Sequence, residues 1–377
     1  MELQQIKGHL ADPACRLVTI TGLGGIGKTR LAIAAAHQAN QESDLLFLNG
    51  VAFVPLAGVM EATSVPLALV NVLDVPLSGA ISPRQALLNF LSNREMLLVL
   101  DNFEHLMAAV ELLLELLQGC PTLKLLVTSR EPLNLATEWR LDLEGLSVPP
   151  AEENEVATLQ SYAAVALFVR FASQVNISFR LSAENAAAVG RLCRLVAGMP
   201  LALQLAATWL RAMSVTAILT ALERDLDVLA TDMHDIPPRQ RSMRAIFESA
   251  WLLLAAEEQR AVEVLAVCRG GFTQAAAADI AQVNLFLLRR IIDRALIYQQ
   301  GEFRYGMHPL IQQFAQEQLK KDNHEAPATA AHGRYYLSWL ADLESALHGM
   351  TPQTAINASK EELDNLRQAW AWGSQAR

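Results

Sequence analysis

The sequence Gly22-Leu23-Gly24-Gly25-Ile26-Gly27-Lys28-Thr29 decides how the first part of this chain folds. It matches the pattern G-x-x-x-x-G-K-[ST], in which the backbone N–H groups of a glycine-rich loop surround a phosphate. In this pattern the lysine contacts the β- and γ-phosphates, and the final hydroxyl contacts Mg²⁺. The expected nucleotide-binding residues are Gly22, Gly24, Gly25, Ile26, Gly27, Lys28, Thr29 and Arg30.

The residues on both sides of the loop fit this interpretation. Residues 16–21 form a short β-branched run, which is typical of a buried parallel strand. Small apolar residues recur on one helical face of residues 31–36. That helix begins near Lys28, so the positive end of its dipole points toward the bound anion. A merely flexible glycine turn would not require a buried strand before it or a helix after it. We therefore predict a nucleotide site.

Composition and charge restrict the class of protein. The 377 residues are enough for two to four domains, and 52% hydrophobic with 18% charged residues indicates a globular chain. The net charge of −9 and the scattered basic residues argue against a broad nucleic-acid-binding surface. The four cysteines lie far apart without a C-x-x-C pair, so neither a metal site nor a disulfide framework is expected.

No segment has the pattern of a signal peptide or a membrane span. The longest apolar stretch, residues 195–210, is interrupted by Gly198-Met199-Pro200 and contains Gln204. It is too short and too broken to cross a bilayer. We therefore expect a cytoplasmic protein without a membrane partner.

Strand and helix signals alternate along residues 1–146. Strands are predicted at 17–21, 51–56, 96–101, 123–129 and 140–143, and helices at 28–40, 66–73, 83–92 and 104–118. This alternation is typical of an α/β domain with a parallel sheet. Right-handed crossovers bring the carboxyl ends of such strands to one edge, where the ligand binds.

The remainder of the chain is predominantly helical. A polar linker at 147–155 precedes a predicted helical bundle at 156–234, and Asp235-Ile236-Pro237-Pro238 separates that bundle from a third domain at 235–320. In the third domain, helical stretches precede an extended piece at 296–305 with Gly301 at its turn, which is the outline of a winged helix. Residues 325–377 are predicted to be helical.

Leu97-Leu98-Val99-Leu100-Asp101 predicts a buried strand that ends in a carboxylate. In P-loop proteins the strand beside the loop strand ends in such an aspartate, which orders the ligands of Mg²⁺. We therefore expect Thr29 and Asp101 to form the Mg²⁺ site. Glu104 or His105 is a candidate to position water, whereas the alternative places Glu104 on a surface helix.

Residues 125–130 predict another buried strand, which ends in two hydroxyls and a guanidinium. Arg130 is a candidate to contact a γ-phosphate, and the alternative is a surface arginine at a strand end. The expected catalytic residues are Lys28, Asp101, Glu104 and Arg130. Two other elements suggest no function on their own: Pro200 is placed as the first residue of a helix, and a lone His308 is more often structural.

These motifs, in this order, resemble the STAND class of signalling ATPases, whose nucleotide module is called NB-ARC. Residues 21–32 and 100–105 are similar to the bacterial branch, which includes large transcriptional regulators. The resemblance extends from about residue 17 to residue 319, and residues 364–367 look like the start of a helical-repeat sensor. It implies a P-loop α/β domain followed by an all-α domain, a winged-helix domain and helical repeats.

The resemblance also implies roles for individual residues toward ADP or ATP and Mg²⁺. Pro200 packs on the adenine, and His308 contacts the β-phosphate of ADP and holds a closed state. Pro309 stands where the family has an aspartate. Asn102 stands where many relatives have a second acid, so slow ATP hydrolysis is expected.

The implied function is a nucleotide-dependent switch. ADP holds the closed form, and the ATP form opens and self-oligomerises in response to a signal ligand or protein recognised by the C-terminal helical repeats. One alternative is a DNA-binding transcription factor that uses Arg289, Arg290 and Arg294, although the apolar residues around them and the negative net charge count against it. Another is an ATPase or kinase for a small substrate, but no substrate-binding group accompanies the loop.

Overall fold

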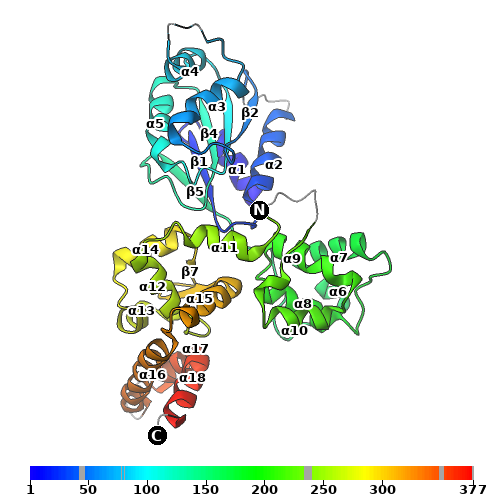
Figure 1. Cartoon of the computed structure of the whole chain (residues 1–377), viewed down its shortest axis with the longest axis vertical. Helices are drawn as coiled ribbons and strands as arrows, with labels where there is room; N and C mark the ends of the chain where they lie inside the picture. The colour runs from blue at the N-terminus through cyan, green and yellow to red at the C-terminus, as the bar shows by residue number, and fades with distance from the viewer. Residues whose placement is uncertain (42–46, 78, 80, 233–239, 348–351, 376–377) are drawn as a thin grey trace. The chain divides into compact units, whose positions relative to one another are not determined.

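The computed structural model describes residues 1–41, 47–77, 79, 81–232, 240–347 and 352–375. These residues divide into two units, Met1–Glu144 and Gly145–Arg377. Figure 1 shows a sheet flanked by helices in the first unit and predominantly helices in the second. The finer division at 146, 156–234, 235–320 and 325–377 stays a prediction, and the break at 235–238 lies outside the described residues.

A five-stranded sheet forms the centre of the first unit. Its strands are β1 (Leu17–Thr21), β2 (Val51–Pro55), β3 (Leu97–Asp101), β4 (Lys124–Thr128) and β5 (Glu138–Asp142). Every neighbouring pair is parallel, in the order β2-β3-β4-β1-β5. The predicted α/β class with a parallel sheet is therefore confirmed, and the carboxyl ends of the strands share one edge.

Helices cover both faces of this sheet. They are α1 (Glu2–Ala11), α2 (Lys28–Gln41), α3 (Val65–Val72), α4 (Pro83–Leu91) and α5 (Val110–Gly119), with short 3₁₀ turns η1 (Ala62–Ser64) and η2 (Met107–Ala109). Successive side chains of a strand point to opposite faces of the sheet. Alternate residues of β3 therefore belong to two different hydrophobic cores. Leu98 and Leu100 pack with α3, α4 and α5, whereas Leu97 and Val99 pack with α1 and α2.

Two expectations about this unit are wrong. The aspartate-bearing strand β3 does not lie beside β1, because β4 lies between them. The helix expected from residue 104 begins instead at Val110, after η2. Its start is delayed because Asn102 adopts a left-handed conformation, with φ of 68°, and the backbone N–H of Phe103 donates to the carbonyl of Thr128. Glu104 therefore lies in the loop after β3. Helix α1 had not been predicted.

The second unit begins with a helical section. It contains α6 (Val156–Leu159), α7 (Ala163–Val175), α8 (Ala186–Leu195), α9 (Pro200–Thr208) and α10 (Val215–Leu222). The 3₁₀ turn η3 (Trp209–Arg211) lies between α9 and α10, and η4 (Leu226–Val228) follows α10. The backbone N–H of Leu146 donates to the carbonyl of Gly198 at 3.0 Å. A Cβ at Gly198, where φ is 65°, would lie 2.0 Å from the carbonyl oxygen of Leu146, so only glycine fits this approach.

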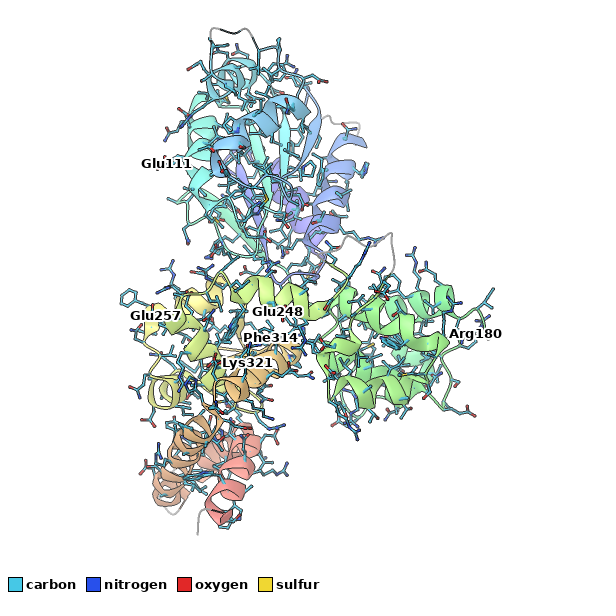
Figure 2. The ribbon with its side chains drawn as sticks, viewed as in Figure 1. Glu111, Arg180, Glu248, Glu257, Phe314 and Lys321 are labelled. Atoms are coloured by element: carbon cyan, nitrogen blue, oxygen red, sulfur yellow. The ribbon has the colours of Figure 1, made fainter. Side chains whose placement is uncertain are left out.

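A mixed section follows, with helices α11 (Met243–Trp251), α12 (Ala256–Leu265), α13 (Gln274–Ala281), α14 (Leu285–Asp293) and α15 (Pro309–Lys321). Its antiparallel sheet has the order β6-β8-β7, from Phe272–Thr273, Arg304–Met307 and Ile297–Gln299. The hairpin β7–β8 contains the expected turn at Gly301, whereas the two-residue β6 had not been predicted. Phe314 of α15, labelled in Figure 2, is buried against Phe247 and Trp251, with ring centroids 6.0 and 5.6 Å away.

Three helices complete the unit: α16 (Glu325–Leu347), α17 (Pro352–Glu361) and α18 (Leu363–Gln375). The fully buried amide of Asn365 joins α18 to the mixed section. Its Nδ2 donates to the carbonyl of Gly271 at 2.9 Å and to Glu362 at 2.7 Å. Its Oδ1 accepts from the backbone N–H of Arg269 at 2.7 Å, and Nε2 of His332 lies 3.1 Å from it. All four hydrogen-bonding positions of this amide are thus used.

The cysteines and the helix lengths complete the description. Cys15, Cys120, Cys193 and Cys268 are buried free thiols. Within the described ranges, no helix combines the length and the apolar character that a bilayer crossing requires.

Replacing Asn365 tests the importance of this amide. We expect Asn365→Ala to lower the free energy of unfolding of the second unit by about 2–4 kcal/mol, because buried partners lose their hydrogen bonds. Urea unfolding followed by tryptophan fluorescence measures this, since every tryptophan except Trp139 belongs to the second unit. Asp364→Ala, at an exposed neighbouring position, is the matched control and should change the value by at most about 0.5 kcal/mol. Equal effects of the two substitutions would contradict the assignment.

Candidate functional site

The glycine-rich loop joins β1 to α2 at the carboxyl edge of the sheet, which gives the first unit the fold of a P-loop NTPase. The loop needs glycine at three positions, because φ is 140° at Gly22, 82° at Gly25 and 108° at Gly27. A Cβ at Gly22 would also lie 2.7 Å from the carbonyl oxygen of Leu143. Ile26 is buried and anchors the loop, while Arg30 is exposed on α2.

Lys28 is held by its own loop. Its Nζ donates to the carbonyl oxygens of Gly22 at 2.7 Å and Leu23 at 3.0 Å. Two carbonyl groups are neutral acceptors, so a phosphate offers this ammonium a stronger partner. The lysine is therefore preorganised at the loop and can exchange its contacts for an anion.

The charges around Lys28 come from the other predicted site residues. Burial lowers the pKa of Lys28 to about 8, and the carboxylate of Glu104 opposes that shift. The guanidinium of Arg130 lowers the same pKa further, and Asp101 raises it. These three side chains therefore influence one ammonium group, and the hydrogen bond from Thr29 to Asp101 joins the start of α2 to the end of β3.

Asp101 is a buried carboxylate that two hydroxyls satisfy. Thr29 and Thr128 each donate to its Oδ1 at 2.7 Å. Thr29 belongs to α2, Asp101 to β3 and Thr128 to β4, which is the strand between β3 and β1. Carboxylate and hydroxyl oxygens are the ligands that Mg²⁺ accepts, and the donor set fits that ion. Thr128 was missed as a site residue, although its place at the end of the 125–130 strand was a usable signal.

Arg130 and Glu104 form an ion pair. Nε of Arg130 lies 3.1 Å from Oε1 of Glu104, and their side chains are 21% and 9% exposed. Both residues follow neighbouring strands, β4 and β3, which explains how side chains distant in sequence meet. Arg130 is thus neither a free surface group nor an isolated sensor.

His105 is already committed to other partners. Its Nε2 lies 2.7 Å from the carbonyl oxygen of Val59, and its Nδ1 lies 3.3 Å from the side-chain nitrogen of Asn102. With the proton on Nε2, both ring nitrogens are used. This arrangement favours Glu104 over His105 as the group that positions water.

Pro200 and His308 belong to the second unit. Pro200 is the first residue of α9, and His308 caps α15, where its Nδ1 accepts from the backbone N–H of Leu310 at 3.2 Å. Burial lowers the pKa of His308 to about 4, and the carbonyl of Val196 offsets part of that effect. The ring is therefore neutral at pH 7. Its buried Nε2 is left to face that carbonyl, but it makes no hydrogen bond of normal geometry within the described part of the chain.

The arginines proposed for DNA contact are engaged with carboxylates. Arg289 pairs with Asp293 at 3.6 Å, within α14. Arg290 pairs with Glu257, which Figure 2 labels, and it also lies 3.0 Å from Glu258. Arg294 lies 3.6 Å from that second glutamate. These ion pairs offset the positive charge of α14 and disfavour it as a phosphate-binding helix.

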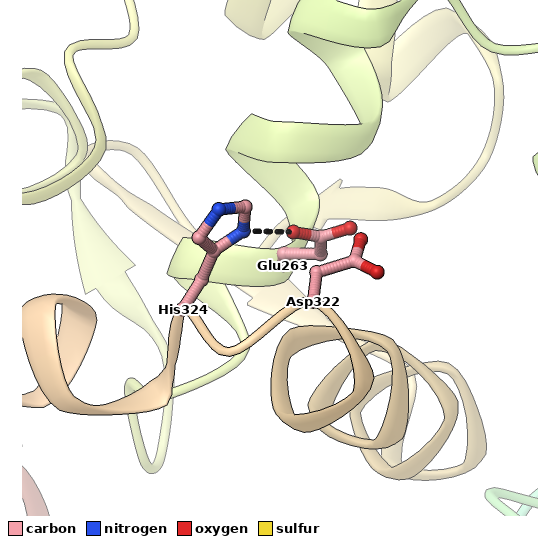
Figure 3. A group of neighbouring side chains, drawn as sticks. All are labelled: Glu263, Asp322 and His324. Atoms are coloured by element: carbon pink, nitrogen blue, oxygen red, sulfur yellow. Dashed lines mark ion pairs between the residues drawn. The ribbon is translucent and has the colours of Figure 1, made fainter.

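Figure 3 shows a further group of charged side chains, in which Glu263 of α12 faces Asp322 and His324. Their ligand-type atoms all lie within 4.8 Å of one another. Asn323, at φ of 58°, lies just after the end of α15, and the N–H of His324 donates to the carbonyl of Leu319. His324 and Arg260 lie 3.6 and 3.7 Å from Glu263, so we interpret the group as an ionic tie between α12 and this turn.

The burial of His308 predicts an acid-sensitive second unit. Its pKa is about 4 in the folded chain and about 6.5 when unfolded, so its contribution is complete above pH 6.5 and lost as the pH falls toward 4. We expect the stability difference between the wild type and His308→Gln to fall by up to about 3 kcal/mol between pH 7 and pH 4. Urea unfolding at several pH values measures this. A difference independent of pH would contradict a buried neutral ring.

Comparisons with known proteins place the chain among actinobacterial relatives, although no protein-family model matches it. A Mycobacterium tuberculosis protein, provisionally named HTH-type transcriptional regulator Rv0890c, is 36% identical over 373 residues, which cover 96% of this chain and 40% of that protein. The regulatory protein AfsR of Streptomyces griseus is 28% identical over 324 residues, covering 80% of this chain and 30% of AfsR. The chain thus spans less than half the length of these relatives.

Two solved structures match this chain at low similarity. A STAND protein with a tetratricopeptide repeat sensor from Pyrococcus horikoshii is 17% identical, with a TM-score of 0.35, over 97% of this chain and 52% of that one. A Walker-type ATPase of Pyrococcus abyssi is 13% identical, with a TM-score of 0.49, over 83% and 94%. The fold assignment rests on the strand order and the loop, since both scores lie below 0.5.

One mycobacterial relative matches along most of its length. The uncharacterized protein Rv0894 of Mycobacterium tuberculosis is 31% identical over 350 residues, which cover 89% of this chain and 84% of that protein. This chain therefore belongs to the same family as Rv0894.

Proposed function

We propose that this chain is a nucleotide-operated switch of the STAND type, which binds ADP or ATP and hydrolyses ATP slowly. The observation that carries this proposal is the place of Lys28, Asp101 and Arg130, which follow or end neighbouring strands at the carboxyl edge of a parallel sheet. A phosphate-binding loop, a buried carboxylate and a guanidinium are the groups that phosphoryl transfer uses. No other part of the described chain gathers this combination.

Each group of the first unit has a physical task in this proposal. The backbone N–H groups of residues 22–27 surround the β-phosphate, and Lys28 exchanges its carbonyl contacts for the β- and γ-phosphates. The hydroxyl of Thr29 and the carboxylate of Asp101 would hold Mg²⁺. That ion would neutralise charge on the phosphates. Arg130 contacts the γ-phosphate, and Glu104 positions the attacking water. Asn102 supplies no second acid, so hydrolysis is slow.

The second unit reports which nucleotide is bound. Its mixed section, with α11–α14 and the three-stranded sheet, supports a winged helix, and Pro200 packs on the adenine. The buried Nε2 of His308 donates to the β-phosphate of ADP, and a hydrogen bond to such a charged group contributes about 1.5–3 kcal/mol. Moving a two-state equilibrium from mostly closed to mostly open needs roughly 5 kcal/mol of differential binding. His308 thus supplies a share of the coupling, and the ATP form self-oligomerises.

The proposed output is transcriptional control, which the names of the longer relatives support. Helices α16–α18 begin a helical-repeat region that binds the signal ligand or protein. Direct DNA binding through α14 is the second candidate, and its paired arginines weigh against it. A salt-dependent shift of duplex DNA by the chain, lost in Arg289→Ala, would favour that candidate.

Replacing the loop lysine tests the nucleotide site. We expect Lys28→Ala to weaken ADP binding by at least about 100-fold, because a buried charge-assisted contact to phosphate is lost. Calorimetry measures the affinity, and mass spectrometry of the denatured purified chain should find ADP released by the wild type and none by the variant. His37→Ala, at an exposed position of the same helix outside the predicted site, distinguishes the loss of the lysine from general effects on α2. Unchanged ADP affinity in Lys28→Ala would refute the site.

The lowered pKa of Lys28 predicts proton uptake on binding. At pH 8 about half of the Lys28 amines are neutral, and a phosphate beside the amine raises its pKa again. ADP binding at pH 8 should therefore take up about half a proton, since the phosphate, with a second pKa near 6, is already ionised. Calorimetry in buffers of different ionisation enthalpy measures this uptake. Lys28→Arg keeps its charge and should show none; equal uptake by both proteins would contradict the assignment.

A further inference from the structure

The ion pair between Arg130 and Glu104 joins two residues to which we assign different tasks in ATP hydrolysis. One is expected to detect the γ-phosphate and the other to position water, yet they lie 3.1 Å apart and are largely screened from solvent. The loop after β3 is fixed to the end of β4, since the N–H of Asn102 donates to the hydroxyl of Thr128 at 2.9 Å. The two side chains are therefore held within reach of each other by the sheet itself.

The second carboxylate oxygen of Glu104 has no visible purpose in the fold. Oε2 is buried and accepts no hydrogen bond from any residue within the described ranges. Burying a carboxylate oxygen without a donor is unfavourable, so its retention needs an explanation. A base must offer a lone pair to a water molecule, and Oε2 is the atom left for that task once the carboxylate is no longer fixed by Arg130 at Oε1.

The same pair lies near the place of the phosphates. Glu104 and Arg130 are the charged groups with the largest effects on the pKa of Lys28, and they act in opposite directions. The lysine contacts the β- and γ-phosphates in loops of this kind. A γ-phosphate at Lys28 therefore enters the field of both partners and competes for the guanidinium.

We infer that Arg130 withholds Glu104 from catalysis until a γ-phosphate draws the guanidinium away, an inference that rests on the proposed ATP switch. The γ-phosphate carries more charge than a carboxylate and accepts bidentate contacts, whereas ADP lacks this group. Released Glu104 takes a proton from water as the water oxygen bonds to the γ-phosphorus. The bond from that phosphorus to the β–γ bridging oxygen breaks, giving ADP and phosphate, and the proton then passes to solvent.

Binding measurements on Glu104→Gln test this exchange apart from catalysis. In the wild type an ATP analogue must break the ion pair, whereas ADP need not. We expect Glu104→Gln to bind Mg²⁺–AMP-PNP about 5-fold tighter, since a partly screened ion pair is worth about 1 kcal/mol, and to bind ADP as the wild type does. ATP hydrolysis should fall by about 100-fold or more, as for the loss of a general base. Unchanged AMP-PNP affinity would overturn the inference.

The Arg130→Met variant distinguishes release of the guanidinium from simple removal of repulsion. Taking away a negative charge near the phosphates also tightens binding, but that gain does not need Arg130. If the exchange operates, the gain in AMP-PNP affinity from Glu104→Gln is smaller in the Arg130→Met background than in the wild-type background. An equal or larger gain there overturns the inference, even if hydrolysis is lost.

Controls separate failure of this exchange from failure of the proposed function. If the wild type binds neither nucleotide, the switch and the exchange fail together. If Lys28→Ala loses ADP while Glu104→Gln shows no Arg130-dependent gain, the exchange alone fails. Glu111→Gln, at an exposed position of α5 labelled in Figure 2, is the matched control and should keep wild-type affinities. Should Glu104→Gln unfold, Glu104→Asp replaces it, because the shorter side chain no longer reaches Arg130 at 3.1 Å.

Discussion

The site of the first unit depends on the two hydrogen bonds that the carboxylate of Asp101 accepts. A carboxylate that is 5% exposed is unfavourable unless donors satisfy it, and the hydroxyls of Thr29 and Thr128 do so. These three residues tie the start of α2 to the ends of β3 and β4. Because all strands are parallel, their carboxyl ends meet at one edge, and this single contact fixes the loop against the strands that carry Glu104 and Arg130.

The polar groups of this site already have partners that a phosphate can replace. Lys28 rests on two carbonyl groups, and Arg130 rests on Glu104. In the proposed switch, binding is therefore an exchange of contacts rather than the filling of an unsatisfied charge. Because contacts are exchanged, the net free energy of nucleotide binding stays small. A few hydrogen bonds can then determine whether ADP or ATP binds more tightly. It also gives the γ-phosphate a task that ADP cannot perform.

The second unit depends on buried polar groups of another kind. Asn365 has every hydrogen-bonding position occupied, whereas Nε2 of His308 has none within the residues described. The first arrangement makes a rigid joint between the mixed section and α18. The second leaves a neutral donor in a buried place, which is costly unless a ligand uses it. The second unit therefore uses buried polar groups in two ways, as a fully bonded joint at Asn365 and as an unsatisfied donor at His308.

The sequence alone determined the parallel α/β class, the phosphate loop and the carboxylate of Asp101, because each follows from local patterns: glycine spacing, β-branched runs and a charged residue after an apolar strand. It did not determine that β4 separates β1 from β3, that Glu104 lies in a loop, or that Arg130 pairs with it. Nor did it reveal the roles of Thr128 and Asn365. These features depend on strand order and on contacts between distant segments, and only the packing of the folded chain selects them.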